Sequence, residues 1–142
     1  MEVIIPKRHE LIVLIPLFIR INPLQRPRAN PHKRGSVYQP KENQKELLFN
    51  MSQFEPLSID SPVIIDSYVQ YSAGKKEVHP VSKKYGDDDN LRKAINDALV
   101  IAGIIEDDRF CVGGETYKSI GDEDFCLIKI WSVGVLNGVV SA

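Results

Sequence analysis

The sequence predicts one α/β (α+β) domain in which a small mixed sheet is combined with two main helices. Three observations lead to this fold class. A length of 142 residues is enough to bury one hydrophobic core without disulfides or a structural metal. Segments rich in Ile, Val and aromatic residues alternate with two segments of helical periodicity. No internal repeat or linker divides the chain, so residues 1–142 are expected to form a single domain.

The first element is a strand. Residues 10–21 are mostly apolar, which predicts a buried strand interrupted near Pro16. Its apolar run, residues 11–19, is too short to span a bilayer. The residues that follow are basic and proline-containing rather than the small residues of a signal-peptide cleavage site. We therefore expect a cytoplasmic protein with no membrane partner.

A basic arm and a helix follow. Residues 22–41 contain four prolines and five basic residues but no acidic residue. Such a composition cannot form a core, so this arm is expected at the surface. Apolar residues at helical spacing, Leu47, Leu48, Met51 and Phe54, then predict a helix over 42–54 that stops before Pro56.

A second strand and the strongest helix prediction come next. Residues 63–71 are β-branched and aromatic, which is typical of a strand. A polar connector, 72–86, leads to an apolar stripe at helical spacing over 91–102. Aspartates stand at the start of this stripe, where a helix dipole favours them, and Gly103 follows its end as the expected terminator.

The C-terminal part predicts a β-hairpin. Residues 109–118 and 125–133 have the composition of strands, and the polar segment 121–124 between them is predicted to form the turn that joins them. Cys111 and Cys126 lie in these runs, fifteen positions apart and among apolar neighbours. This pattern excludes a disulfide scaffold and a cysteine-based zinc ribbon, and it predicts two reduced, partly buried thiols.

The formal net charge of −1 hides two halves of opposite sign. Residues 1–84 contain 13 Lys and Arg against 8 Asp and Glu, whereas residues 85–142 contain 5 against 11. A basic half favours a polyanionic partner, and an acidic half favours bound cations.

The acidic residues most able to carry chemistry flank the second helix. Asp87 and Asp89 stand at its start, Asp107 and Asp108 stand beyond its end, and Lys93 lies four residues after Asp89. If the chain after Gly103 runs back beside the helix start, the carboxylates could converge, and a divalent cation such as Mg²⁺ would offset their repulsion. The alternative is that these are solvated capping and turn residues.

Two other metal sites are excluded. An EF-hand loop would require Asp or Asn and then Gly where the chain has Leu91 and Arg92. A zinc site would require His or Cys at ligand spacing, but His9, His32 and His79 are each isolated in the sequence.

The basic arm is the candidate DNA-binding element. Its cations can each contact a phosphate, and they are Arg26, Arg28, Lys33, Arg34 and Lys41. Tyr38, within the same segment, could add base stacking. The alternative is a solvated loop without a partner.

The acidic helix and its surroundings resemble a known family. Residues 87–99 read D-x-D-N-L-x-K-x-x-x-D-A-L, and Gly103 and the pair Asp107-Asp108 follow after short gaps. This pattern is similar to the signature of the RusA-type Holliday-junction resolvases. The resemblance covers roughly residues 11–131; residues 1–9 and 134–142 have no counterpart in it.

The resemblance implies a RusA-like fold and a set of catalytic residues: Asp87, Asp89, Lys93 and Asp108. It further implies that Asp87, Asp89 and Asp108 hold Mg²⁺, that the protein is a homodimer, and that it resolves four-way DNA junctions by paired cuts in recombination and repair. Two other functions stay open. One is a protein of the same fold that binds branched DNA without cutting it, and the other is a Mg²⁺-dependent nucleotide phosphohydrolase.

Overall fold

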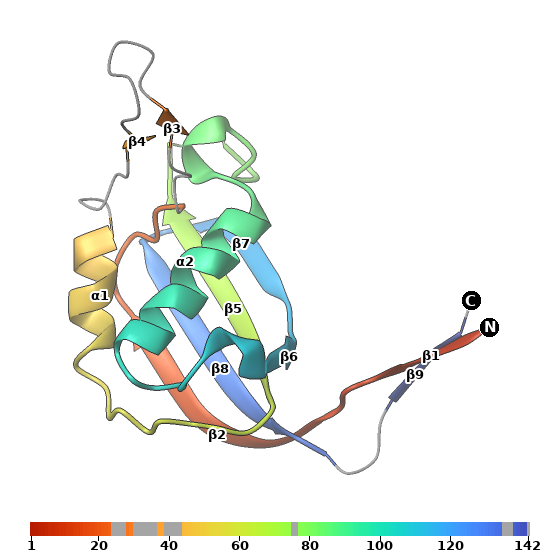
Figure 1. Ribbon diagram of the computed structural model, residues 1–142. Helices are drawn as coiled ribbons and strands as arrows, with labels where there is room; N and C mark the ends of the chain where they lie inside the picture. Colours follow the sequence, from red (N-terminus) through yellow and green to blue (C-terminus); the bar gives the residue numbers. More distant parts are fainter. Residues whose placement is uncertain (24–27, 30–36, 39–43, 75–76, 135–137, 142) are drawn as a thin grey trace.

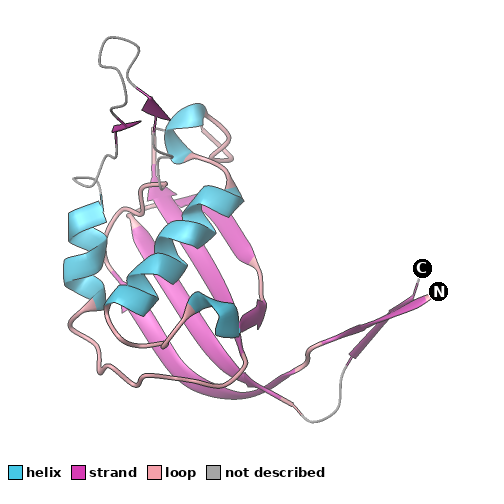
Figure 2. Cartoon of the chain, in the orientation of Figure 1, coloured by secondary structure: helices cyan, strands magenta, loops and turns pink. Residues whose placement is uncertain are grey.

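Two helices cover one face of a five-stranded sheet, and a thin two-stranded ribbon projects from the sheet's lower end (Figure 1). The computed structural model describes residues 1–23, 28–29, 37–38, 44–74, 77–134 and 138–141. The architecture is mixed α+β, as predicted, with the helices together on one side of the strands (Figure 2).

The sheet has a central antiparallel part and a parallel edge. Strand β8 (Phe125–Val133) lies between β2 (Arg8–Leu17) and β5 (Val63–Ser72) and is antiparallel to both. On its other side, β5 pairs in parallel with β6 (Cys111–Gly113) and β7 (Thr116–Gly121). Strand β2 is therefore an edge strand, where a proline such as Pro16 is tolerated.

The predicted hairpin of 109–118 with 125–133 is wrong. The first run is divided into β6 and β7, and β5 lies between β7 and β8. The intervening turn crosses the end of β5 instead of joining paired strands: Gln70 Nε2 donates to Glu123 O at 2.8 Å, and the Ser72 N–H donates to Asp124 Oδ1 at 2.9 Å. Because β5 uses both of its edges, the two C-terminal runs cannot reach each other.

The helix predictions hold, with shorter bounds for the first. Helix α1 spans Lys45–Met51, and α2 spans Asp88–Ile101. Asp87 is the N-cap of α2, where its Oδ1 accepts the Asn90 N–H at 2.9 Å. Gly103 has φ +75° just after the helix, which is the expected left-handed termination.

The core lies between the helices and the near face of the sheet. Strand side chains alternate between the two faces, so every second residue of β5 and β8 points toward the helices. The larger fully buried side chains include Ile15, Leu17, Ile21, Met51, Tyr71, Tyr85, Leu91, Ile95, Leu99, Ile104, Ile105 and Ile128. The apolar segment predicted as a strand over 10–21 thus ends as a strand at Leu17 but stays in the core through Ile21.

Both cysteines are free thiols in strands, as predicted: Cys111 is partly buried and Cys126 is buried. Burial raises the pKa of the Cys126 thiol to about 12. The described part of the chain contains no helix long and apolar enough to cross a membrane.

The smaller elements lie outside the five-stranded sheet. In the ribbon, β1 (Glu2–Ile5) pairs antiparallel with β9 (Gly138–Ser141). Within the basic arm, β3 (Arg28–Ala29) pairs with β4 (Val37–Tyr38). Neither pair was predicted, because runs of two to four residues give too little periodicity to identify a strand.

A buried carboxylate stands on the face of the sheet opposite the helices. Asp66 on β5 accepts two hydrogen bonds from the Arg8 guanidinium, at 2.8 and 2.7 Å. It also accepts the Trp131 Nε1–H at 2.9 Å and the Glu115 N–H at 3.0 Å. Burial alone would raise the pKa of Asp66, but these bonds outweigh it and hold the pKa below its usual value.

Because of this network, the free energy of unfolding is expected to vary with pH in the acidic range. The unfolded carboxyl has a pKa of about 3.9, and the folded one is lower, so protonation favours the unfolded chain. The stabilisation by Asp66 is complete above the unfolded pKa and is lost as the pH falls through the folded pKa. We expect the difference in unfolding free energy between wild type and Asp66→Asn to be largest at neutral pH and to shrink in acid. Urea unfolding across this range measures it.

Asp60→Asn is the matched control, because Asp60 is exposed. The difference in unfolding free energy between wild type and Asp60→Asn should not shrink in this way as the pH falls. If the Asp66→Asn difference were the same at neutral and acidic pH, the carboxylate would not be stabilised by its four bonds.

Candidate active site

The first turn of α2 presents three consecutive carboxylates to solvent. Asp87, Asp88 and Asp89 are all exposed. One oxygen of Asp87 caps the helix, and one oxygen of Asp88 accepts the Asp89 N–H at 3.1 Å. Among the described residues, the second oxygen of each and both oxygens of Asp89 accept no hydrogen bond. Four carboxylate oxygens at this end of the helix are therefore available to a cation or its bound waters.

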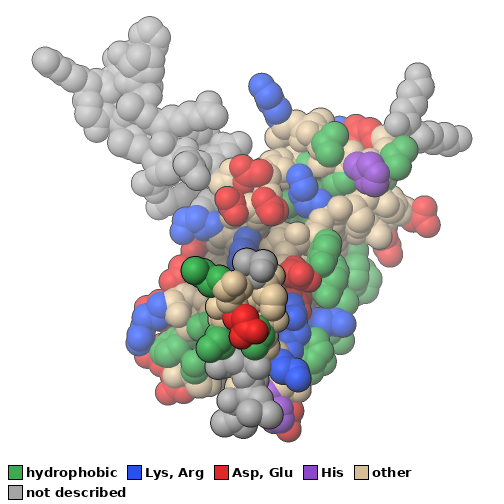
Figure 3. Space-filling model, turned by 90° about the vertical axis from the view of Figure 1, so that its right-hand side faces the viewer, with side chains coloured by type: hydrophobic (Ala, Val, Ile, Leu, Met, Phe, Trp, Pro, Cys, Tyr) green, Lys and Arg blue, Asp and Glu red, His purple; other side chains and the backbone are tan. Residues whose placement is uncertain are grey.

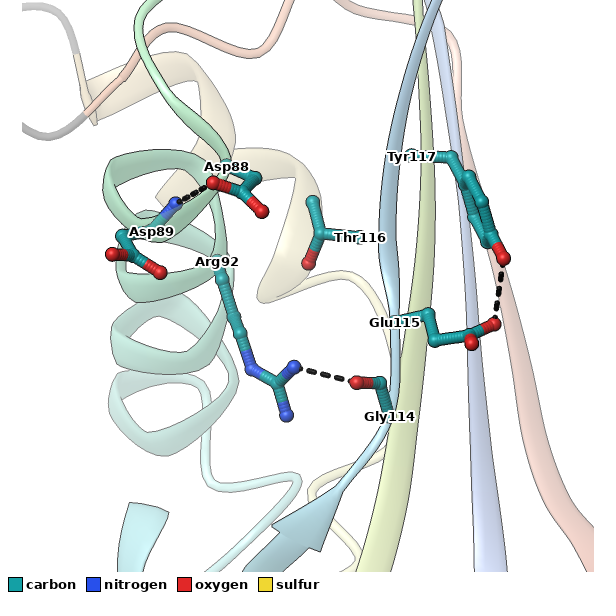
Figure 4. A pocket seen from close by; sticks show the side chains of 7 residues that line it. All are labelled: Asp88, Asp89, Arg92, Gly114, Glu115, Thr116 and Tyr117. Atoms are coloured by element: carbon teal, nitrogen blue, oxygen red, sulfur yellow. Dashed lines mark hydrogen bonds between the residues drawn. The ribbon is translucent and has the colours of Figure 1, made fainter. Parts of the chain in front are cut away.

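A pocket of about 340 Å³ opens between this turn and the start of β7. Asp88, Asp89 and Arg92 line it from α2, and Gly114–Tyr117 line it from the end of the β6–β7 connection and the start of β7 (Figure 4). Arg92 reaches across and donates to Gly114 O at 2.8 Å. Thr116 Oγ1 is buried and has no hydrogen-bond partner in the described structure, so the pocket wall retains an unused polar atom.

Glu115 and Tyr117 lie at the far rim of the pocket. Figure 4 shows their side chains turned away from α2, with the Tyr117 hydroxyl donating to Glu115 at 2.7 Å. This bond raises the pKa of Tyr117, so the phenol remains protonated at neutral pH.

Lys93 points along α2 away from the acidic turn. Its Nζ lies 3.5 Å from Asp97 Oδ1, one turn further along, and the side chain is 61% exposed. The sequence placed Lys93 on the same helical face as Asp89, but in the structure its ion pair is with Asp97. An exposed pair of this kind contributes only about 0–1 kcal/mol, so the ammonium is held only weakly at Asp97.

The chain does return toward the helix start, but later than the sequence suggested. After Gly103, Ile104 and Ile105 are buried, and Ile105 bridges to Ile59. Asp108 then opens the short 3₁₀ helix Asp108–Phe110, which leads into β6. The returning chain meets the first turns of α2 at Gly114.

The predicted grouping of Asp87, Asp89 and Asp108 is therefore not assembled in one chain. In the part of the chain that the structure describes, no three Asp, Glu, His or Cys residues are grouped closely enough to hold a metal ion together. A site made by two of the aspartates still fits Mg²⁺, which is often held by one or two carboxylates, with water and substrate phosphates completing its shell. Asp87 and Asp89, with free oxygens on exposed side chains, fit this description, whereas Asp108 does not complete a group of three with them.

The base of the basic arm is fixed next to the acidic turn. A Cβ on Gly86, the residue before Asp87, would overlap the ring of Pro23, so this ring packs closely against the Gly86 backbone. Just before the arm, the Arg20 guanidinium lies 5.1 Å from the ring centre of Tyr71 and 5.4 Å from that of Tyr85. Pro23, at the base of the arm, therefore lies beside the start of α2.

Of the predicted DNA-binding residues, only the backbone of Arg28, in β3, is described. The others, Arg26, Lys33, Arg34 and Lys41, lie outside the described residues.

Sequence reasoning missed the wall of the pocket. Arg92 occupies a variable position of the D-x-D-N-L-x-K pattern. Gly114 and Thr116 lie within residues 109–118, which the sequence predicts to be one continuous strand. Their roles arise from the parallel pairing of β7 with β5, which places them opposite α2. No local signal in the sequence indicates that pairing. No protein-family model and no curated protein sequence matches the chain.

Proposed function

We propose that this protein is a Mg²⁺-dependent, structure-selective DNA endonuclease that resolves four-way junctions as a homodimer. The observation that carries the proposal is the contact of Pro23 with Gly86, which joins the base of a cationic arm to an exposed turn of three aspartates. Phosphates bound by the arm would lie next to carboxylates able to hold a metal ion. The similarity of residues 87–108 to the RusA-type pattern supports the same function.

Each residue has a distinct task in this proposal. Asp87 and Asp89 would hold the ion, which supplies Lewis-acid charge at the scissile phosphate and a bound water of lowered pKa. Asp88 would bind the ion's outer waters. Lys93 would leave Asp97 to balance the charge that develops on the phosphate. The arm would bind the backbone of the DNA and set its position relative to the carboxylates.

The test is a labelled synthetic four-way junction, incubated with the protein with and without Mg²⁺, beside a linear duplex of the same sequence. The expected result is paired cuts in opposed strands of the junction, only with Mg²⁺, and an intact duplex. Selective binding without cuts would make the protein a branched-DNA-binding protein. Hydrolysis of nucleoside triphosphates with an intact junction would make it a phosphohydrolase.

The arm is tested by the salt dependence of binding. Replacing Arg26, Arg28, Lys33 and Arg34 by Ala should weaken junction binding because each removes a phosphate contact. The slope of log affinity against log salt should become shallower by about 0.9 for each lost contact on duplex DNA. Fluorescence anisotropy at several salt concentrations measures it. The exposed Lys45, just beyond the arm, provides a control variant. An unchanged slope would show that the arm does not bind the backbone.

The Lys93→Ala variant distinguishes two roles of Lys93: a charge that acts in catalysis, and one half of a surface ion pair. As a pair with Asp97, Lys93 would contribute only about 0.3–0.5 kcal/mol to folding. As a charge acting on the transition state, its loss should slow single-turnover cleavage on the order of a hundredfold, about 2.7 kcal/mol. Asp97→Ala breaks the same pair but keeps the ammonium, so this variant should cleave at nearly the wild-type rate. Equal, small losses in both variants would assign Lys93 to the helix surface alone.

A further inference from the structure

Lys118 joins the sheet to the backbone directly before the acidic turn. Its Nζ donates to the Gly86 carbonyl oxygen at 2.9 Å, across 32 positions of the sequence. The Gly86 carbonyl belongs to the peptide bond that leads into Asp87, the N-cap of α2. A hydrogen bond at this carbonyl therefore acts on the direction in which the chain enters the helix, and with it on the position of the Asp87 side chain.

The alternation of side chains along β7 directs Lys118 toward the helices. Residues two apart on a strand lie on the same face. Ile120 packs against the core and Thr116 lines the pocket, so Lys118, between them, lies on the helix side of the sheet. Tyr117, its neighbour, stacks on Tyr68 on the opposite face. Lys118 therefore reaches the start of α2 from the same wall as the pocket.

Gly86 has a backbone conformation that only glycine readily adopts. Its φ of +73° and ψ of 179° fall in a region that is essentially closed to other residues. Three contacts hold it there: its N–H donates to Lys83 O at 3.2 Å, the Pro23 ring packs against it, and Lys118 binds its carbonyl. Of these three, the Lys118 bond is the one made to the peptide group that Gly86 shares with Asp87.

The Lys118 ammonium brings positive charge to the acidic turn without occupying a carboxylate. Within the described parts of the chain Lys118 forms no ion pair, whereas Lys93 is paired with Asp97. A nearby cation reduces the repulsion among three neighbouring aspartates. Figure 3, a view from the side of β7, shows acidic side chains next to basic ones on this face. Because Lys118 is bonded to a carbonyl, the Asp87 oxygen that does not cap the helix stays available to a metal ion.

We propose that Lys118 is a positioning residue of the candidate active site: by holding the Gly86 carbonyl, it fixes the backbone from which Asp87 reaches a bound cation. The proposal rests on the proposed function, in which Asp87 and Asp89 hold Mg²⁺. Outer contacts that orient metal ligands change metal affinity by about 10–100-fold when they are removed. An ammonium bonded to Asp87 itself would compete with the ion, and the carbonyl contact avoids that competition.

The alternative is that Lys118 supplies charge alone, and the two roles predict changes of metal affinity with opposite sign. Loss of a positive charge strengthens the attraction of a divalent cation to the carboxylates. Loss of the contact that orients Asp87 weakens metal binding. Lys118→Met removes both the charge and the hydrogen bond, so the sign of its effect separates the roles. Lys118→Arg keeps the charge and the N–H donors, so this variant should behave as wild type.

Binding of Mn²⁺ to the full chain without DNA, followed by electron paramagnetic resonance, is the first test. Mn²⁺ shares the preference of Mg²⁺ for carboxylate oxygens. Lys118→Met should weaken Mn²⁺ binding about tenfold, and Lys118→Arg should restore it. Lys129→Met is the matched control, because Lys129 is also half-buried on a strand but lies over Tyr68 on the opposite face. This control should bind Mn²⁺ as wild type does. Equal or tighter binding by Lys118→Met would overturn the proposal.

Amide hydrogen exchange tests the same contact without a metal ion. The Asn90 N–H donates to Asp87 Oδ1 at 2.9 Å. In Lys118→Met this amide should exchange about fivefold faster, the equivalent of one lost helix cap. The amide of the buried Ile95, further along α2, should exchange as in wild type.

Equally faster exchange at both amides would assign Lys118 to the stability of the fold alone. Unchanged exchange at Asn90 would overturn the proposal even if the wild type bound metal only together with DNA. Neither measurement uses cleavage, so failure of the role of Lys118 and failure of the endonuclease proposal can be told apart.

Discussion

In the Asp89→Asn variant, cleavage of a four-way junction is expected to fall about a thousandfold, or about 4 kcal/mol of activation free energy. The change keeps the shape of the side chain but removes a negative charge from the exposed first turn of α2. Binding of the junction should be equal or tighter, because one source of repulsion toward DNA phosphates is lost. Single-turnover cleavage at saturating Mg²⁺, with affinity measured in parallel, separates the two effects.

Asp122→Asn is the matched control for this variant. It makes the same change of charge on an exposed residue beyond the far end of β7. Its cleavage rate should equal that of wild type. If Asp89→Asn also cut the junction at the wild-type rate, Asp89 would not hold the metal, and the site would have to be placed elsewhere.

Gly114→Ala is expected to reduce the free energy of unfolding by about 3 kcal/mol. Gly114 has φ +125°, which side chains rarely adopt, and a Cβ there would overlap the carbonyl oxygen of Ile65 in β5. The strand would have to move away from β5, and the carbonyl that accepts the Arg92 hydrogen bond would move with it. Urea unfolding followed by circular dichroism measures the loss.

The neighbouring Gly113→Ala variant controls for the loss of glycine itself. Gly113 has an ordinary φ, and the nearest atom to a Cβ there would be Ile64 Cγ1 at 3.9 Å. Alanine is also favoured over glycine in a strand. The stability of this variant should equal or exceed that of wild type. Equal destabilisation of both variants would mean that the contact between Gly114 and the Ile65 carbonyl is not the cause of the lost stability.

The sequence allowed good prediction of elements that are defined by local chemistry. Helix α2 has both a start and a stop signal, and the structure places its N-cap at Asp87 and its left-handed terminator at Gly103. Strand β5, predicted over 63–71, spans Val63–Ser72. In both cases the residues that determine the element lie within or next to it, so a short window contains the necessary information.

What could not be predicted depends on pairings between distant segments. The local sequence of the two β runs after α2 is typical of a hairpin, but β7 pairs with one edge of β5 and β8 pairs with the other. The same pairing brings Gly114, rather than Asp108, to the acidic turn. The ribbon joins residues from the two ends of the sequence, each in a run too short to be identified alone. Local patterns contain no information about which partner a strand edge will choose.

The position of β8 between β2 and β5 has a consequence for how the protein folds as it is synthesised. Glu10 and Ser132, which are hydrogen-bonded to each other, are 122 positions apart in the sequence. While the ribosome adds the residues between them, the apolar segment of β2 has no strand to pair with. Its first stable partner arrives only after both helices and β5 have been made. Because such long-range pairings form slowly, nascent chains pass through an extended period in which β2 is open to chaperones or to aggregation.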